Sequence, residues 1–280
     1  MWYFAGTSTH MIPGADDAIT RDGKALILAY DHGLEHGPVD FEPVPETTDP
    51  ATVFDVGTHD AVTAVAVQKG VAEAYYPSYE DDVTLLAKLN GTSNLWMGEP
   101  DSAVNWSVDY AAELGADAIG FTLYGGSNHE VEMAEEFRRA QETAREHDMG
   151  VVMWSYPRGQ GLKDDTSPGT IAYASRLGLE LGADIAKVKY PGSADAMNWA
   201  VQSAGDMKVV MSGGSKTSDE AFLSTVRDAM DAGANGLAVG RNVFQRENPE
   251  AILDGLEAVI FDDASVEEAL GATAGLEAGD

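Results

Sequence analysis

Short apolar segments recur along the chain and, in its second half, alternate with segments of helical periodicity. The helical segments lie near residues 129–147, 167–181, 193–204 and 217–232. Continuous apolar strands that alternate with helices are typical of a parallel sheet covered on both faces. The eight predicted strands are Ala25–Tyr30, Ala64–Gln68, Thr84–Leu89, Ala118–Tyr124, Val151–Tyr156, Asp184–Tyr190, Lys208–Met211 and Gly236–Val239.

Eight such strands within 280 residues predict a parallel, eight-stranded (β/α)8 barrel that occupies residues 1–280 as one domain. A doubly wound open sheet is the alternative. We expect an N-terminal segment, 1–23, before the first strand and an acidic C-terminal segment, 262–280. The Pro-rich stretch 38–50 predicts a long loop, and loops of that length are often functional.

A short repeat stands directly before three of the apolar runs. It reads ELGAD at 113–117 and 180–184, and DAGAN at 231–235. Each copy predicts a helix end with its glycine in the left-handed conformation, followed at once by a buried strand. These glycines are Gly115, Gly182 and Gly233.

The charge of the chain is strongly unbalanced, with 17 Lys and Arg against 47 Asp and Glu and a net charge of −30. The acidic residues are dispersed, which favours a halophilic, cytoplasmic protein whose repulsion salt would screen. No basic face is available for nucleic acid, and no apolar run reaches the ~18 residues that span a membrane. The short apolar N-terminus lacks the basic flank of a signal peptide. Without cysteine, a disulfide scaffold, a thiolate metal site and a cysteine nucleophile are excluded.

Two lysines follow one another at alternate positions of the predicted strand 184–190. Lys187 and Lys189 fall on the same face, and Lys187 has apolar neighbours in the strand. A lysine desolvated inside a barrel has a lowered pKa and can attack a carbonyl as a neutral amine, and we expect Lys189 to lower that pKa further. The alternative is a pair of ordinary lysines at a strand edge or in an ion pair.

Further candidate residues lie at the carboxyl ends of other strands, where barrel enzymes place their active sites. Trp154 and Tyr156 share a face beside the lysine strand, so Tyr156 is a candidate proton carrier, although the two rings can equally fill the barrel mouth. Ser212, Gly213 and Gly214 follow the seventh strand, and Gly240 and Arg241 follow the eighth. Backbone N–H groups at glycines and a forked guanidinium suit a phosphate group, whereas two plain turns are the alternative.

The first strand ends in a run with two histidines and two carboxylates. Asp31 is a candidate for orienting substrate or handling protons, whereas His32 and His36, with Glu35 between them, superficially suggest a divalent metal. A catalytic zinc needs a third protein ligand, and no other histidine has a matching spacing. We therefore expect no metal, and the roles of His32 and His36 stay open.

Five motifs resemble, in their wording and their order, those of the archaeal-type class I fructose-bisphosphate aldolases of the DeoC/FbaB family. The motifs are AYDHGLEHGP, WSYPRG, AKVKYPG, MSGGSKT and VGRNVFQ, and the match extends over 24–248. Together with the acidity, the resemblance implies a halophilic archaeon as the source. The resemblance implies a (β/α)8 barrel without cofactor or metal. It implies cleavage of fructose 1,6-bisphosphate through a Schiff base to dihydroxyacetone phosphate and glyceraldehyde 3-phosphate, in glycolysis and gluconeogenesis.

The resemblance also implies roles for individual residues. Lys187 falls on the Schiff-base lysine, Tyr156 on the general acid/base and Asp31 on an aspartate of the first strand. The residues that line the pocket or cradle the phosphate are Trp154, Ser212, Gly213, Gly214, Gly240 and Arg241. The family forms homo-oligomers built of pentamers, which implies a pentamer-based assembly here, such as a decamer.

The segments 159–165 and 262–280 match nothing in that family, and the second phosphate of the substrate has no assigned binder; Arg158 or a lysine is the candidate. One alternative function is the related Schiff-base enzyme of archaeal aromatic biosynthesis, 2-amino-3,7-dideoxy-D-threo-hept-6-ulosonate synthase, and an autoinducer thiolase is a further related barrel. The wording DHGLEHGP and WSYPRG favours the glycolytic aldolase. A second alternative is a non-catalytic phosphate-binding barrel, which would need neither Lys187 nor Tyr156.

Overall fold

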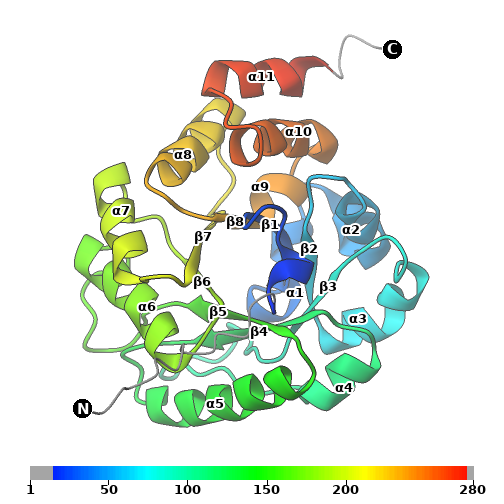
Figure 1. Ribbon diagram of the computed structural model, residues 1–280. Coiled ribbons are helices and arrows are strands. Elements are labelled where there is room, and N and C mark those ends of the chain that lie inside the picture. The colour runs from blue at the N-terminus through cyan, green and yellow to red at the C-terminus, as the bar shows by residue number, and fades with distance from the viewer. Residues whose placement is uncertain (1–14, 276–280) are drawn as a thin grey trace, which may run out of the picture.

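The computed structural model describes residues 15–275 and has a closed barrel of eight parallel strands at its centre (Figure 1). The strands follow one another around the barrel in sequence order, and the last pairs with the first. The predicted (β/α)8 barrel is confirmed, and the open sheet is wrong. The strands are β1 Ala25–Tyr30, β2 Ala64–Gln68, β3 Leu85–Lys88, β4 Ala118–Leu123, β5 Gly150–Ser155, β6 Ile185–Val188, β7 Lys208–Ser212 and β8 Gly236–Val239.

Helices surround the barrel, and the four that the periodicity predicted are present to within two residues at each end (Figure 1). The predicted loop 38–50 contains two short 3-10 helices, each begun by a proline whose fixed φ suits a first helical position. The α-helices are α1 His32–Glu35, α2 Pro50–Gly57, α3 Lys69–Tyr75, α4 Val108–Glu113, α5 Glu130–Glu146, α6 Pro168–Leu181, α7 Ala194–Ser203, α8 Asp219–Asp231, α9 Arg241–Phe244, α10 Pro249–Ile260 and α11 Val266–Gly275. The 3-10 helices are η1 Asp17–Ile19, η2 Pro38–Phe41, η3 Pro45–Thr48 and η4 Tyr76–Ser78.

The inside of the barrel is filled mainly by small and β-branched side chains, which form a cluster separate from the core between the strands and the helices. Ile19 of η1 belongs to this inner cluster and is fully buried. The segment from residue 15 to 23 therefore closes the amino-terminal end of the barrel (Figure 1). The opposite end of the barrel, at the carboxyl ends of the strands, is formed by loops that carry polar side chains.

A polar side chain precedes each even-numbered strand and accepts a hydrogen bond from a backbone N–H of the strand before it. We call these four contacts the clamps. Three of them are the last residues of the repeat, whose glycines have φ of 94°, 86° and 92°, as the sequence predicted. The clamps are Thr63 Oγ1 to Leu26 N (3.1 Å), Asp117 Oδ2 to Leu85 N (3.3 Å), Asp184 Oδ2 to Val151 N (2.8 Å) and Asn235 Oδ1 to Val209 N (3.0 Å).

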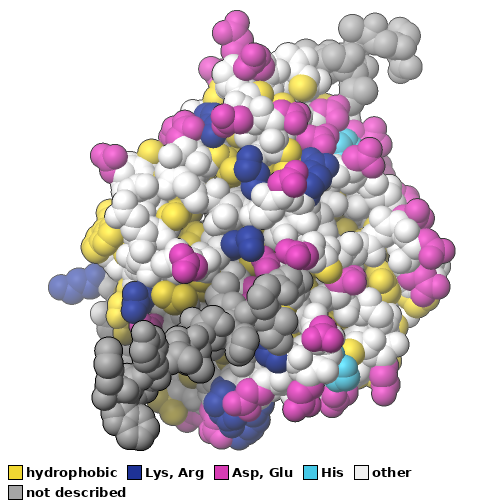
Figure 2. All heavy atoms as spheres, viewed as in Figure 1, with side chains coloured by type: hydrophobic (Ala, Val, Ile, Leu, Met, Phe, Trp, Pro, Cys, Tyr) yellow, Lys and Arg dark blue, Asp and Glu magenta, His cyan; other side chains and the backbone are white. Residues whose placement is uncertain are grey.

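On the face that Figure 2 shows, Asp and Glu side chains are scattered over many elements and are not gathered into one patch. The acidic carboxyl-terminal segment forms α11 as far as residue 275, and this helix packs against α8 and α10. Among the described residues, no helix combines the length and the apolar character needed to cross a membrane.

Candidate active site

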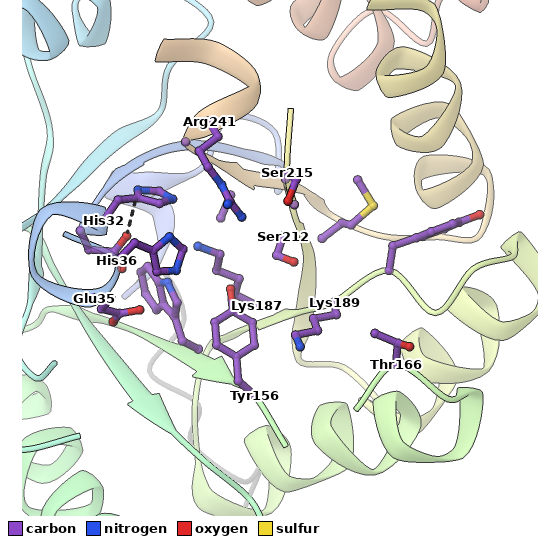
Figure 3. Close-up of a pocket in the computed structure, with 18 of the residues that line it drawn as sticks. His32, Glu35, His36, Tyr156, Thr166, Lys187, Lys189, Ser212, Ser215 and Arg241 are labelled. Carbon is purple, nitrogen blue, oxygen red and sulfur yellow. Dashed lines mark ion pairs between the residues drawn. The ribbon is translucent and has the colours of Figure 1, made fainter. Parts of the chain in front are cut away.

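A cavity of about 400 Å³ opens at the carboxyl ends of the strands (Figure 3). This volume lies within the range of small-molecule sites. The structure brings every sequence-predicted site residue to this one cavity, although the residues come from five different strand ends. Those residues are Asp31, Trp154, Tyr156, Lys187, Ser212, Gly213, Gly214, Gly240 and Arg241.

Lys187 is the last residue but one of β6 and extends into the cavity (Figure 3). It is 5% exposed, and its Nζ lies 4.7 Å from the centroid of the Trp154 ring. Burial lowers the pKa of Lys187 to about 8, because the ammonium form loses its hydration; Asp31 and Glu35 oppose this shift. A usable fraction of the side chain is therefore a neutral amine near neutral pH.

Trp154 lies inside the barrel, and a glycine on the neighbouring strand makes room for it. A Cβ on Gly120 of β4 would stand 2.6 Å from Cζ3 of Trp154, so any larger residue would push the ring away. The indole is 1% exposed, and its Nε1 has no hydrogen-bond partner among the described residues. The ring therefore forms a fixed wall against which Lys187 lies.

Tyr156 follows β5 directly, with its backbone N–H still bonded to Leu123 O of β4. Burial raises the pKa of Tyr156 well above 10, and the negative charges of Asp31 and Glu35 raise it further. The hydroxyl is consequently a neutral phenol that can donate a proton. Figure 3 shows it directed toward Lys187.

Asp31 is the first residue after β1 and is 5% exposed. Burial alone would raise its pKa, but the positive charges of Lys187, His32 and Lys88 outweigh burial and hold the pKa below the ordinary value. The cavity thus contains an ionised carboxylate facing the amine of Lys187.

His32 and His36 lie side by side, with ring centroids 5.2 Å apart. Their ligand atoms and a carboxylate oxygen of Asp40 lie within 4.8 Å of one another, so the structure supplies the third donor that the histidine spacing lacked. However, His36 Nδ1 is already hydrogen-bonded to Asp40 Oδ2 at 2.5 Å, and Arg241 Nη1 lies 3.9 Å from the other oxygen. Burial also lowers the pKa of His32 to about 4. His36 and Asp40 are therefore already engaged in contacts within the protein. The expectation of no metal stays a prediction.

The glycines of the predicted phosphate cradle are required for different reasons. A Cβ on Gly213 would stand 2.7 Å from Val239 Cγ2, and one on Gly240 would stand 2.2 Å from His32 Cε1, so close packing demands both. Gly214 has open space around it but a φ of 68°, which favours glycine. Arg241 extends from α9 into the cavity opposite Ser212 (Figure 3).

Lys189 does not have the effect on Lys187 that the sequence suggested. Because β6 ends at Val188, Lys189 lies beyond the strand, and its amine forms an ion pair with Asp165. Asp165 belongs to the segment 159–165, which the family resemblance left unplaced. The charges that act on the Lys187 amine are those of Asp31, Glu35 and Lys88.

Lys88, at the end of β3, is a buried charged residue beside the cavity that the sequence reasoning missed, and its Nζ lies 5.6 Å from the centroid of the Trp154 ring. It is completely buried, and its Nζ donates to Asn90 O (2.5 Å), Asn90 Oδ1 (3.2 Å) and Glu35 Oε1 (3.4 Å). The signal was present, because Lys88 follows Leu-Leu-Ala in a chain with only eight lysines. The same argument that selected Lys187 applied to it.

Comparisons with known proteins agree with this geometry. The family model described as "DeoC/LacD family aldolase" matches residues 25–246. The "Fructose-bisphosphate aldolase class 1" of Halobacterium salinarum is 76% identical over 93% of this chain and 99% of its own length. The protein of the same name from Thermoproteus tenax is 44% identical over 89% of this chain and 94% of its own.

Solved structures give the same result. One described as "Crystal structure of an Archaeal fructose 1,6-bisphosphate aldolase" superposes with a TM-score of 0.85 at 44% identity, over 88% of this chain and 97% of that one. Another, of a "Schiff Base Forming Fructose-1,6-bisphosphate Aldolase", has a TM-score of 0.84 at 43% identity, over 88% and 98%. The sequence match and the barrel geometry lead to one conclusion: the chain belongs to the DeoC/LacD family of aldolases.

Proposed function

We propose that this protein is a class I fructose-bisphosphate aldolase that reversibly cleaves fructose 1,6-bisphosphate to dihydroxyacetone phosphate and glyceraldehyde 3-phosphate. The observation that carries the proposal is the amine of Lys187, which is buried against Trp154 and faces Asp31 and Tyr156 in one cavity. The family membership and the names of the relatives support it.

The first step joins Lys187 to the substrate. Its neutral amine adds to the C2 carbonyl, and the resulting carbinolamine loses its hydroxyl as water after taking a proton from the Tyr156 phenol. The product is an iminium ion, and Tyr156 becomes a phenolate. Asp31, which is ionised and lies in the same cavity, stabilises the positive charge.

The second step breaks the C3–C4 bond. The electron pair of that bond moves toward the iminium nitrogen and forms an enamine, while the C4 hydroxyl proton passes to the Tyr156 phenolate and glyceraldehyde 3-phosphate leaves. Tyr156 then returns the proton to C3. Addition of water to C2 releases dihydroxyacetone phosphate and restores the amine of Lys187, so that protons balance over the cycle.

One substrate phosphate is bound, in this proposal, by Ser212, the backbone N–H groups near Gly213, Gly214 and Gly240, and the guanidinium of Arg241. We assign the second phosphate to Arg158. Within residues 15–275, this side chain forms no ion pair, although it lines the same cavity and lies 4.9 Å from the Tyr124 ring. A guanidinium that lines the cavity and is paired with no carboxylate of the described residues suits a phosphate group.

The test of the proposed function is borohydride reduction in the presence of dihydroxyacetone phosphate, followed by peptide mass mapping, with a parallel cleavage assay on fructose 1,6-bisphosphate. We expect a stable adduct on Lys187, and we expect Lys187→Met to abolish both the adduct and cleavage. An adduct on Lys189 alone would overturn the assignment. An adduct on Lys187 without cleavage of the bisphosphate would favour the aromatic-pathway synthase, and no adduct at all would favour a non-catalytic phosphate-binding barrel.

We also propose a cytoplasmic homo-oligomer built of pentamers, such as a decamer, with a phosphorylated sugar as its ligand and without nucleic-acid or membrane partners. Its support is the family membership and the exposed apolar loop at Leu95, Trp96 and Met97, which are 86%, 61% and 91% exposed. An exposed apolar loop of this kind is suited to burial against a second copy of the chain. Light scattering at high salt measures the assembly, and a monomer would contradict it.

A further inference from the structure

The two buried lysines of the barrel mouth approach the same aromatic ring. Lys88 Nζ lies 5.6 Å and Lys187 Nζ 4.7 Å from the centroid of the Trp154 indole. The two nitrogens are therefore within about 10 Å of each other, and both lysines and the ring between them are buried. At that separation, and at an effective dielectric constant of about 20, one charge changes the protonation equilibrium of the other about tenfold.

Lys88 is held in a single position. Its three hydrogen bonds go to Asn90 and Glu35, and Asn90 is itself fixed because its side chain bonds Thr122 N (2.7 Å), Thr122 O (2.8 Å) and Ser102 O (3.1 Å). All three partners are oxygen acceptors, one of them a carboxylate, which suits an ammonium group and fixes its position. The Lys88 amine cannot swing toward substrate, and it leaves covalent chemistry to Lys187.

Resting on the proposed function, we propose that Lys88 is a positioning residue for the Schiff-base lysine: its fixed ammonium repels a proton from Lys187 and holds the carboxylate of Glu35 away from it. Both effects keep the Lys187 amine nucleophilic. Glu35, which lines the cavity and is mostly buried, exerts the opposite influence, because a free carboxylate would favour the ammonium form.

Other charged groups also face or border Lys187, and the test must separate them from Lys88. They are Asp31 after β1, His32, Glu35 and His36 near α1, Tyr156 and Arg158 after β5, Lys189 after β6 and Arg241 of α9. A substitution at Lys88 leaves all of these side chains in place in the sequence, and the one among them that it deprives of a partner is Glu35. The two members of the Lys88–Glu35 pair can be altered one at a time, with opposite expected effects.

The experiment measures the reaction of Lys187 with 2,4-pentanedione as a function of pH. The unprotonated amine condenses with one carbonyl of the diketone, water leaves, and the enaminone formed absorbs in the near ultraviolet. Lys187→Met gives the blank, and mass mapping locates the adduct. This readout needs no aldolase turnover, so a failure of the proposed function and a failure of this inference give different results.

We expect Lys88→Met to move the midpoint to higher pH and to slow the reaction at pH 7 about tenfold. Glu35→Gln should move the midpoint to lower pH, and Lys88→Arg, which keeps the charge, should restore a near-normal midpoint. Lys208→Met, which removes a lysine charge at the closed end of the barrel, is the matched control and should leave the midpoint unchanged. Unchanged midpoints in Lys88→Met and Glu35→Gln, or shifts in the same direction, would overturn the proposal.

Discussion

Arg145 holds the carboxylate of Asp184 with both arms of its guanidinium, at 2.6 and 2.7 Å. Asp184 is 4% exposed and also serves as one of the clamps, so the pair ties helix α5 to the amino-terminal ends of β5 and β6. The fork geometry requires an arginine. It lies at the end of the barrel opposite the cavity.

Removing Arg145 should therefore reduce stability without altering the chemistry. Arg145→Met leaves a buried carboxylate without its partner, and we expect it to lower the free energy of unfolding by about 3 kcal/mol. Urea denaturation measures the loss, and the pH midpoint of Lys187 labelling should stay that of the parent protein. Arg145→Lys should recover only part of the stability. A fully stable Arg145→Met would show that the pair contributes little.

The lowered pKa of Lys187 should cost stability. The folded protein binds fewer protons than the unfolded chain between about pH 8 and the ordinary lysine pKa of about 10.4, so the contribution of Lys187 to stability rises with pH across that window. At neutral pH, Lys187→Met removes an ammonium group whose burial destabilises the folded state. We therefore expect the melting temperature of this variant to exceed that of the parent protein. The advantage should shrink above pH 8. An equal or lower melting temperature at pH 7 would contradict this expectation.

Tyr156→Phe should separate Schiff-base formation from cleavage. Without the phenol, proton transfer to and from substrate slows, and we expect turnover to fall ~10²–10⁴-fold. Borohydride should still trap dihydroxyacetone phosphate on Lys187, although more slowly, because the amine is intact and water can supply the proton that the carbinolamine needs to lose its hydroxyl. A variant with near-normal turnover would reduce Tyr156 to a packing residue.

Chelation should leave the activity unchanged. His36 and Asp40 already bond each other, and the Schiff-base chemistry proposed here uses no metal. The measurement is cleavage before and after incubation with EDTA, followed by addition of zinc. Activity that EDTA removes and zinc restores would establish His32, His36 and Asp40 as ligands and would contradict the Schiff-base mechanism.

Salt should act in opposite directions on stability and on substrate binding. A net charge of −30 destabilises the compact state and any assembly of several copies, and molar KCl screens charges beyond a few ångströms. We expect melting temperature and oligomer size to rise from about 50 mM to molar KCl, while the KM for the bisphosphate also rises because Arg241 attracts substrate less. Melting and light-scattering series with parallel kinetics test this. Full stability and assembly at low salt would show that the acidity is not a halophilic adaptation.

The fold and most of the cavity could be predicted because their signals are local. Buried strands such as 236–239 are unbroken apolar runs in the sequence, and the glycine of each repeat copy indicates the turn before a strand. What could not be predicted depends on pairing between distant segments. Lys88 meets Glu35 across 53 residues, and Lys189 meets Asp165 across 24, so no spacing in the chain reveals either pair.

The clamps have a consequence for how this barrel can change over generations. They join β1 to β2, β3 to β4, β5 to β6 and β7 to β8 at the closed end, by side chains that never reach the cavity. Substitutions in the loops at the open end can therefore accumulate without loosening the strands that carry those loops. Because the clamps lie at one end of the barrel and the reactive side chains at the other, exchange of loops can produce new substrate preferences while the barrel stays intact.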